Sequence, residues 1–419
     1  MPIPFLTSLF FDGVPSWMPH LSTILKTGGT LGAVTLTKLY IAGATCTAER
    51  DMHGRVVIIT GGTSGIGAVL AEEFARRGAQ LVLLTRQHQS DPFLVDYIDD
   101  LRERTNNQMI YTEQVDLASL HSIRQFATKW IDNSPPRRLD MIVLCAATMT
   151  PPGGKRTETA EGIETTWMVN YLANFHLLAI LNPAIKAQQF DRDVRIVIPT
   201  CSTYIGSPPL DVPMEEKDWS PGRAYARSKL ALMVFALTYQ KHLDAYKRPD
   251  QLPMNSRVFL VDPGYTRTPG MRRWLTRGSL FGLLIYMLLY PLVWLLLKSP
   301  VMGAQSILYA ALEGSLVREK GGKLLKECME VDYARKDIKD DEVAKKLWEA
   351  SDKLIEKTEK ESAVKRAKAK KEQEKRDEEE KQKKQVEEIE SLVDAISKGK
   401  KKETQKAKTG KRAKKTAEK

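Results

Sequence analysis

The chain has 419 residues, enough for one large α/β domain with extensions or for two ordinary domains. Hydrophobic residues make up 42% of the sequence, which excludes a chain that is disordered throughout. The formal net charge is +12, and residues 351–419 carry 24 Lys and Arg against 16 Asp and Glu. Since this basic excess belongs mainly to the tail, it excludes no class of substrate for the rest of the chain.

The four cysteines are widely spaced, at Cys46, Cys145, Cys201 and Cys328. They form no CxxC pair and have no histidine cluster nearby, so the sequence predicts neither a disulfide framework nor a metal site. Cys145 and Cys201 lie in or beside apolar runs, where a buried, reduced thiol is the simplest interpretation. This pattern favours a soluble body that faces the cytosol.

An apolar, irregular segment occupies residues 1–50. It has no basic region at its start, which argues against a secretory signal peptide. The stretch 30–44 is short for a membrane-spanning helix and carries Lys38 near its centre. This segment has two interpretations, a peripheral membrane contact or a short helix packed on the body.

Short β-branched runs alternate with helical patterns between residues 55 and 261. The runs are 56–60, 81–85, 109–115, 141–144, 194–198 and 257–261. Most of them are largely apolar, as expected of parallel strands that are buried on both faces. The helical patterns between them include 67–77, 120–130 and 225–242. The alternation predicts an α/β fold with a Rossmann-like, doubly wound parallel sheet, within a domain that spans residues 51–340.

Residues 279–297 form an uncharged, apolar segment bounded by Arg277 and Lys298. Its nineteen residues just reach the thickness of a bilayer's hydrocarbon core. A full span would put the following residues across the membrane from the rest of the fold, so a segment that enters one leaflet and returns fits better. A buried helix that covers a pocket is the alternative. The amphipathic aromatic residues favour membrane insertion: Tyr286, Tyr290 and Trp294.

The C-terminal part is expected to be helical and charged. Residues 341–358 predict an amphipathic helix, because Val343, Leu347 and Leu354 recur at helical spacing after two aspartates. Residues 359–419 are low-complexity sequence rich in Lys and Glu, which predicts a charged single helix followed by disorder. Such a basic end can bind anionic lipid or nucleic acid. It has no interleaved aromatic residues, so we expect a solvated tail and no specific nucleic-acid partner.

The sequence TGGTSGIG occupies residues 60–67, directly after an apolar run and before a helical pattern. Glycines allow a tight turn there and let the backbone approach a pyrophosphate closely. The N-terminus of the helix then offers unpaired N–H groups to the anion. We therefore expect a dinucleotide to bind at this turn. The residues expected to contact it are Gly61, Thr63, Ser64, Gly65, Ile66 and Gly67.

Tyr225 and Lys229 are four residues apart on a predicted helix, so their side chains lie on one face. A phenol has a pKa of about 10, too high for ready proton exchange near neutrality. A neighbouring ammonium group favours the phenolate and lowers that pKa. An exposed helix pair is the alternative, but the two residues follow a strand end rich in Ser and Thr, which favours a catalytic tyrosine.

Together, TGxxxGxG at 60–67 and YxxxK at 225–229 resemble the short-chain dehydrogenase/reductase family. The closer resemblance is to its retinol-dehydrogenase-like branch, including fungal lipid-droplet members, and it covers roughly residues 51–354. It implies that Asp116 and Leu117 lie at the adenine and that Asn170 completes a proton relay. The segment PGYTRT at 263–268 resembles the family's stretch over the nicotinamide, which implies cofactor contacts from Pro263, Gly264 and Thr266.

Two segments depart from the family pattern. The family's NNAG reads LCAA at 144–147, so small residues persist while both asparagines are gone. Cys145 and Ala146 are the positions expected beside the cofactor. The family's serine aligns with either Cys201 or Ser202, and Ser202 is the candidate because a hydroxyl holds a carbonyl oxygen best. Cys201 in that place would favour a weak or inactive enzyme.

The preferred cofactor is inferred from the end of the second strand. Proteins that prefer NAD usually carry Asp or Glu there, whereas this chain has Thr85-Arg86-Gln87. Arg86 can face a 2′-phosphate, so NADP(H) is expected in preference to NAD(H). An ordinary surface arginine is the alternative interpretation.

The resemblance implies transfer of a hydride and a proton. Tyr225 would exchange the proton, while Lys229 would lower its pKa and hold the ribose. Ser202 would orient the substrate oxygen, and Asn170 would position a water. The expected function is an NADP(H)-dependent oxidoreductase that interconverts a lipophilic alcohol and its aldehyde or ketone, of the retinoid, sterol or fatty-aldehyde kind. The resemblance implies that the substrate loop lies between Thr268 and Lys298, and a lipophilic substrate is expected because most of that segment is apolar.

The expected location is the endoplasmic reticulum membrane or the surface of a lipid droplet, with the catalytic domain facing the cytosol. Family relatives often dimerise, so a homodimer is an open expectation. The alternative function is a catalytically weak family member that acts on lipid droplets or membranes as a structural or recruitment protein.

Overall fold

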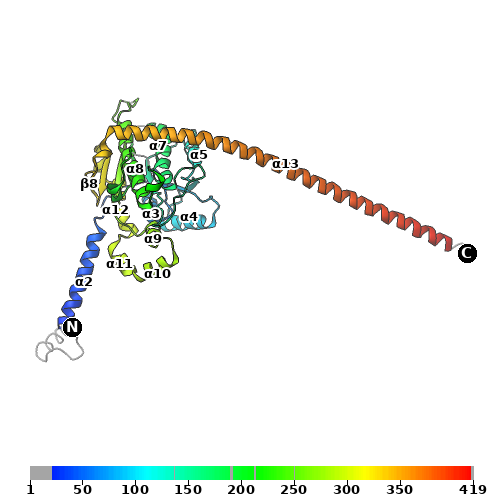
Figure 1. Ribbon diagram of the computed structural model, residues 1–419, viewed down its shortest axis with the longest axis horizontal. Helices are drawn as coiled ribbons and strands as arrows, with labels where there is room; N and C mark the ends of the chain where they lie inside the picture. Colours follow the sequence, from blue (N-terminus) through cyan, green and yellow to red (C-terminus); the bar gives the residue numbers. More distant parts are fainter. Residues whose placement is uncertain (1–20, 136, 189–191, 212–213, 250, 417–419) are drawn as a thin grey trace. The chain divides into compact units, whose positions relative to one another are not determined.

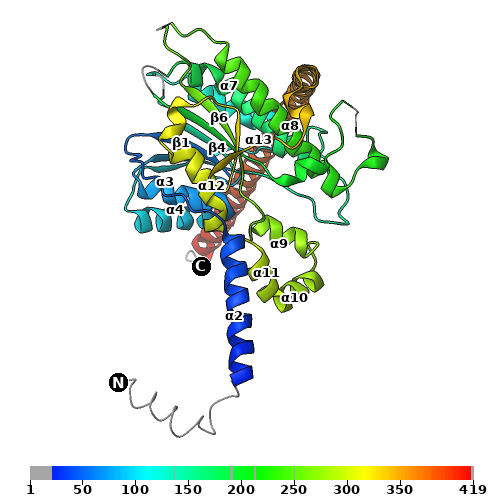
Figure 2. The ribbon, with the colours of Figure 1, turned by 90° about the vertical axis from the view of Figure 1, so that its left-hand side faces the viewer.

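The computed structural model describes residues 21–135, 137–188, 192–211, 214–249 and 251–416. The chain forms two compact units, Met1–Ile355 and Glu356–Lys419. The first unit contains one sheet with helices on both faces (Figures 1 and 2). The described part of the second unit belongs to a long charged helix, α13 (Asp341–Thr416), which begins in the first unit.

The sheet has eight strands in the order β3-β2-β1-β4-β5-β6-β7-β8. The bounds are β1 (Val56–Thr60), β2 (Gln80–Thr85), β3 (Ile110–Gln114), β4 (Met141–Leu144), β5 (Val194–Pro199), β6 (Ser256–Asp262), β7 (Lys323–Lys326) and β8 (Met329–Val331). The pairs from β3 to β7 are parallel, and β8 is antiparallel to β7. The strand order reverses between β1 and β4, which in doubly wound sheets marks where ligands bind. The predicted doubly wound α/β sheet is therefore confirmed.

Helices cover both faces of the sheet, and each face has its own hydrophobic core. One face carries α3 (Gly65–Arg76), α4 (Pro92–Thr105) and α12 (Pro300–Leu312), with Phe74 fully buried (Figure 2). The other carries α5 (Leu120–Ile131), α7 (Ala173–Lys186) and α8 (Pro221–Asp244), with Phe175 and Phe235 buried. The strands are apolar on both sides because both sides are covered.

The remaining helical elements complete the first unit. They are α2 (Leu21–Ala42), α6 (Thr165–Trp167), η1 (Met168–Leu172), η2 (Ser202–Gly206), η3 (Glu216–Asp218), α9 (Pro269–Leu275), α10 (Leu280–Leu288), α11 (Tyr290–Leu296), η4 (Ser315–Arg318) and η5 (Lys336–Lys339). Among the described residues, one helical stretch is long and apolar enough to cross a membrane, Thr165–Lys186. Because 67% of that stretch is buried inside the fold, it is a core helix.

The first turns of α13 pack on the outer side of α7 and α8. The Trp348 ring lies 5.0 Å from the Phe175 ring and 5.7 Å from the Phe235 ring. The hydroxyl groups of Ser351 and Tyr171 are hydrogen-bonded at 2.7 Å. The start of the amphipathic helix expected over 341–358 therefore covers apolar side chains that α7 and α8 would otherwise expose.

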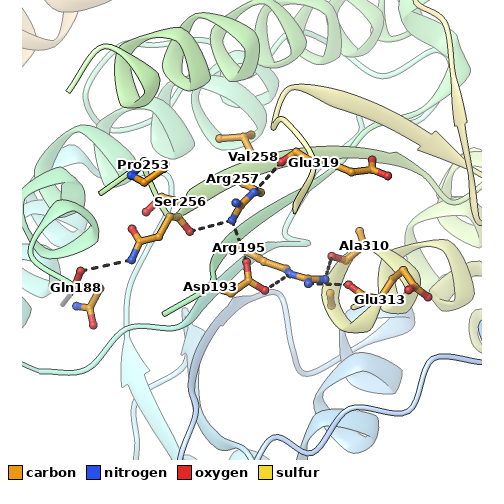
Figure 3. Close-up of polar contacts among 12 residues, drawn as sticks. Gln188, Asp193, Arg195, Pro253, Ser256, Arg257, Val258, Ala310, Glu313 and Glu319 are labelled. Atoms are coloured by element: carbon orange, nitrogen blue, oxygen red, sulfur yellow. Dashed lines mark hydrogen bonds and ion pairs between the residues drawn. The ribbon is translucent and has the colours of Figure 1, made fainter. Parts of the chain in front are cut away.

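A buried arginine network ties α12 to the sheet (Figure 3). Arg195, on β5, is completely buried and donates from Nε to Asp193 Oδ2 at 2.7 Å. Its other nitrogens donate to the carbonyl oxygens of Ala310 and Glu313, at the C-terminal end of α12. Arg257 also pairs with Asp193. A buried charge persists only where it is paired and hydrogen-bonded, and this network meets both conditions.

Candidate functional site

The glycine turn after β1 has no room for larger residues. A Cβ on Gly61 would lie 2.9 Å from Ala146 Cα, and a Cβ on Gly67 would lie 2.2 Å from the Gly61 carbonyl oxygen. Gly61 and Gly65 have φ angles of +68° and +58°, which only glycine adopts readily. Ser64 is the N-cap of α3 and makes no side-chain capping hydrogen bond. The turn and the helix N-terminus thus fit the pyrophosphate of a dinucleotide.

Two residues that the sequence analysis did not assign hold this turn. Tyr97, on α4, donates from its hydroxyl to the Gly62 carbonyl oxygen at 2.9 Å. Thr60 Oγ1 accepts from the backbone N–H of Ala146 at 3.1 Å, which joins the ends of β1 and β4. Thr60 thus anchors the LCAA segment. Burial raises the pKa of the Cys145 thiol to about 12, so this neighbour is a neutral thiol.

The residues expected at the nucleoside lie where β2 and β3 end. Arg86 directly follows β2 and is exposed. Asp116 lies just beyond β3, where its carboxylate accepts from the Ala118 N–H at 2.9 Å, while its own N–H donates to Ser122 Oγ. Leu117 packs on the hydrophobic core. The guanidinium of Arg86 makes no hydrogen bond or ion pair within the part of the chain that the structure describes.

Tyr225 and Lys229 lie together on α8. The Lys229 Nζ lies 5.8 Å from the centroid of the Tyr225 ring and donates to the Pro199 carbonyl oxygen at 3.1 Å, at the end of β5. Burial raises the pKa of the Tyr225 phenol well above its usual value, and Cys201 and Asp262 raise it further. Burial also lowers the pKa of Lys229. The structure therefore shows a raised phenol pKa, in place of the lowering by Lys229 that was expected, because the phenol is desolvated.

Asn170 lies in the π-helical turn η1, a distortion that is frequent at functional sites. Its Nδ2 donates to the Thr148 carbonyl oxygen at 2.9 Å and to Ser228 Oγ at 3.1 Å. Its Oδ1 accepts from the Thr148 N–H at 2.7 Å. The side chain therefore joins the loop after β4 to the helix that carries Tyr225. Thr148, its partner, was not assigned from the sequence.

The two serine candidates have different partners. Ser202 Oγ donates to Asp262 Oδ2 at 2.5 Å, at the end of β6. Cys201 Sγ is hydrogen-bonded to Thr203 Oγ1 at 2.8 Å, and Cys201 is a neighbour that raises the pKa of the Tyr225 phenol. Both candidates therefore lie at this end of β5, with Ser202 paired to Asp262 and Cys201 beside the phenol. Asp262 is a further residue that the sequence analysis missed, although it directly precedes Pro263-Gly264.

The segment expected over the nicotinamide lies against the glycine turn. A Cβ on Gly65 would lie 3.2 Å from Thr268 Cγ2. Asp262 Oδ1 accepts from the Gly264 N–H at 2.9 Å, and Thr266 Oγ1 donates to the Gly264 carbonyl oxygen at 3.3 Å. Pro263 stands between Asp262 and Gly264 in this turn. The glycine turn, the 263–268 segment and the α8 pair thus border one region at the carboxyl ends of the strands.

Thr63 and Ile66 lie within the same turn, and Ile66 is partly buried against a core cluster. The described residues contain no group of three or more His, Cys, Asp or Glu side chains that could hold a metal ion. The side-chain groups that the chain itself brings to this site are the Tyr225 phenol, the Lys229 ammonium group and the Cys201 thiol.

Comparison with known proteins identifies relatives over most of the chain. A family model described as short chain dehydrogenase matches residues 55–277. The uncharacterized oxidoreductase pbr1 of Schizosaccharomyces pombe is 43% identical, over 88% of this chain and 99% of its own. Retinol dehydrogenase 13 of Mus musculus is 32% identical, over 78% and 92% of the two chains. Polyprenol dehydrogenase of Mus musculus is 33% identical, over 70% and 82%.

Proposed function

Since the chain belongs to the short-chain dehydrogenase family, in its retinol-dehydrogenase-like branch, we propose that it interconverts a lipophilic alcohol and its aldehyde or ketone with NADP(H) at a membrane surface. Family membership makes it an enzyme that acts on CH–OH or C=O groups with a nicotinamide cofactor. The observation that carries the finer proposal is the pair of a half-buried Tyr225 and a buried Lys229 near the glycine turn and the 263–268 segment.

The proton is proposed to come from Tyr225. A bound nicotinamide supplies or accepts the hydride at the substrate carbon. Burial keeps the phenol protonated at neutral pH, so in the reducing direction it donates to the carbonyl oxygen. Lys229 holds its ammonium group at the end of β5, where it can bind the ribose, and Asn170 fixes the loop after β4. Replacing the phenol by Phe removes the acid and should lower kcat about 100-fold or more.

NADP(H) is proposed over NAD(H) because of Arg86. It directly follows β2 and is exposed, and the chain has no acidic residue at this position. An acidic side chain here would bind the ribose 2′-hydroxyl and repel a 2′-phosphate. A guanidinium instead pairs with phosphate oxygens through charge-assisted hydrogen bonds.

The proposed substrate is an isoprenoid alcohol or the corresponding carbonyl compound. The names of two relatives refer to retinol and polyprenol, which are both lipophilic alcohols. In this chain the segment between Thr268 and Lys298 closes over the loop after β4, since a Cβ on Gly278 would lie 3.7 Å from Pro151. Most of that segment is apolar, which suits a long hydrocarbon chain.

A membrane contact is proposed at the apolar hairpin α10–α11. Its helices are exposed, with Leu280 at 86% and Leu288 at 80% exposure. Monomeric soluble proteins rarely leave so large a contiguous apolar surface in water. Nearby basic residues suit anionic lipid headgroups, and all three are exposed: Arg272, Arg273 and Arg277. This arrangement supports insertion into one leaflet.

The helix α2 belongs to the same surface. Lys38 Nζ donates to the carbonyl oxygens of Trp294 at 2.5 Å and Leu297 at 3.1 Å, at the C-terminal end of α11. Both views of the chain draw α2, α10 and α11 on one side of the first unit (Figures 1 and 2). Since α2 also exposes apolar residues such as Leu36, we propose that α2 and the hairpin bind the membrane together.

Vesicle flotation of the full chain tests this surface. The variant Leu284→Glu/Leu288→Glu places two charges on the exposed face of α10, and we expect it to leave the vesicle fraction. Met329→Glu, at an equally exposed apolar residue on β8, is the control and should float like the original chain. Equal flotation of the Leu284/Leu288 variant would contradict a membrane contact at the hairpin.

One observation favours the alternative of a catalytically weak membrane protein. The group beside Tyr225 is a thiol, which donates a weaker hydrogen bond than a hydroxyl. That alternative predicts that Tyr225→Phe leaves the cellular function unchanged, whereas deletion of residues 279–297 abolishes it. Our proposal predicts that Tyr225→Phe alone abolishes the function while membrane binding persists.

A further inference from the structure

We infer that Cys201, and not Ser202, is the residue that holds the substrate oxygen beside Tyr225. The inference rests on the proposed oxidoreductase function and deepens it, because it names the second group at the reacting oxygen. It assigns a thiol to a position where the sequence favoured a hydroxyl.

The hydroxyl of Ser202 is already committed. It donates to Asp262 Oδ2 at 2.5 Å, a charge-assisted hydrogen bond of the strong kind. A hydroxyl has one proton, so it cannot also donate to a substrate oxygen. The other carboxylate oxygen of Asp262 accepts from the Gly264 N–H at 2.9 Å. Ser202 therefore helps to fix the turn of the 263–268 segment and acts on the nicotinamide side of the site.

The side chain of Cys201 has different neighbours. Its backbone is extended, with φ −163° and ψ 155°, whereas Ser202 begins the 3-10 turn η2. Its sulfur lies 2.8 Å from Thr203 Oγ1, and it is close enough to Tyr225 and Lys229 to raise the pKa of both side chains, although burial lowers the pKa of Lys229 overall. When the Thr203 hydroxyl donates to the sulfur, the S–H proton is free for a substrate oxygen. The phenol and the thiol then offer two donors to one oxygen atom.

The proposed step needs no chemistry at the sulfur. In reduction, the Tyr225 O–H bond breaks and the alcohol O–H bond forms, while the hydride from the nicotinamide reaches the carbon. Cys201 keeps its proton throughout and only hydrogen-bonds the oxygen as negative charge develops on it. Tyr225 is then reprotonated from solvent. The thiol is a weak donor, so its contribution should be smaller than that of an oxyanion-hole amide.

Steady-state kinetics of three variants in detergent, with all-trans-retinal and NADPH as probes, separates the two residues. Cys201→Ala should lower kcat about tenfold, below the loss of 100-fold or more seen when a strong oxyanion donor is removed. Cys201→Ser restores a donor and should match or exceed the original kcat. Ser202→Ala should mainly raise the KM for NADPH, because it loosens the Asp262–Gly264 turn. A kcat that falls in Ser202→Ala and is unchanged in Cys201→Ala would overturn the inference.

A spectroscopic titration tests the contact without turnover. The ionisation of Tyr225 is followed by phenolate absorbance, as the difference between each chain and the same chain with Tyr225→Phe. Because Cys201 raises the pKa of this phenol, Cys201→Ala should move the transition to lower pH, and Ser202→Ala should not. Lys229 and Asp262, the charged groups nearby, are present in both variants. An unchanged transition in Cys201→Ala would overturn the inference.

The two experiments also separate this inference from the proposed function. Absence of NADPH-dependent turnover in the original chain, with the titration shift present, would contradict the proposed function and leave the Cys201–Tyr225 contact established. Turnover that Tyr225→Phe abolishes and Cys201→Ala does not change would contradict the inference alone. Cys328→Ser, at a cysteine between β7 and β8, is the matched control. It should change neither kcat nor the pH of the phenolate transition.

Discussion

Removal of the Asp193 carboxylate tests how the first unit is held together. Asp193 is the acidic partner of three arginines: Arg195 at 2.7 Å, Arg50 at 2.9 Å and Arg257 at 3.4 Å. Since Arg195 is completely buried, Asp193→Ala leaves its charge in the fold without a counterion. Breaking a buried ion pair from one side costs about 3–5 kcal/mol. For a unit of this size the loss corresponds to a fall in Tm of about 4–7 °C.

The assay is thermal unfolding of the full chain in detergent, followed by circular dichroism. Glu113→Ala is the matched control, because it removes a partly exposed carboxylate from a pair with the exposed Lys129 at 3.0 Å. Such surface pairs contribute between about 0 and 1 kcal/mol, so Tm should change by about 1 °C or less. If Asp193→Ala lowers Tm no more than Glu113→Ala does, the arginine network does not fix α12 to the sheet as argued.

Three further predictions concern packing, pH and cofactor choice. Trp348→Ala should destabilise the fold by about 2 kcal/mol, roughly half the loss at a fully buried Trp, and thermal unfolding that is unchanged would contradict the packing of α13 on α7 and α8. Burial raises the pKa of Tyr97 from 10.0 to about 12. Between these pH values the folded state keeps a proton that the unfolded state loses, so the free energy of unfolding should fall as pH rises from about 10 to 12. Denaturant unfolding at a series of pH values measures this, and Tyr97→Phe should reduce the slope. Arg86→Ala should weaken NADPH binding about tenfold and leave NADH binding unchanged by fluorescence titration, whereas an equal loss for both would contradict the 2′-phosphate role.

The sheet could be predicted largely from the sequence, because its central strands are apolar on both faces. β7 and β8 were not predicted, because they lack such an apolar run. Both are short, and β7 begins at Lys323 and ends at Lys326. β8 is the edge strand and β7 lies next to it, in the part of the sheet where charged residues are compatible with pairing. A run of four residues with a lysine at each end has no period that distinguishes a strand from a loop.

The candidate site could be predicted where its residues are close in sequence. The glycine turn and the Tyr225–Lys229 pair each follow from spacing on one element. The contacts of Thr60 with Ala146 and of Tyr97 with Gly62 join different elements, and no local pattern encodes them. The choice between the two serine candidates depends on which side chain faces α8, and that is set by the register of β5 against its neighbours.

NADPH consumption by the purified full chain in detergent tests the central claim most directly. The substrates are all-trans-retinal, a polyprenyl aldehyde, a long-chain fatty aldehyde and a sterol ketone, each measured beside Tyr225→Phe. The account predicts turnover of at least one of these compounds, reduced about 100-fold or more in the variant, with NADPH binding retained. Turnover that is equal in both chains, or no turnover of any compound, would contradict an NADP(H)-dependent enzyme that uses Tyr225 as its acid.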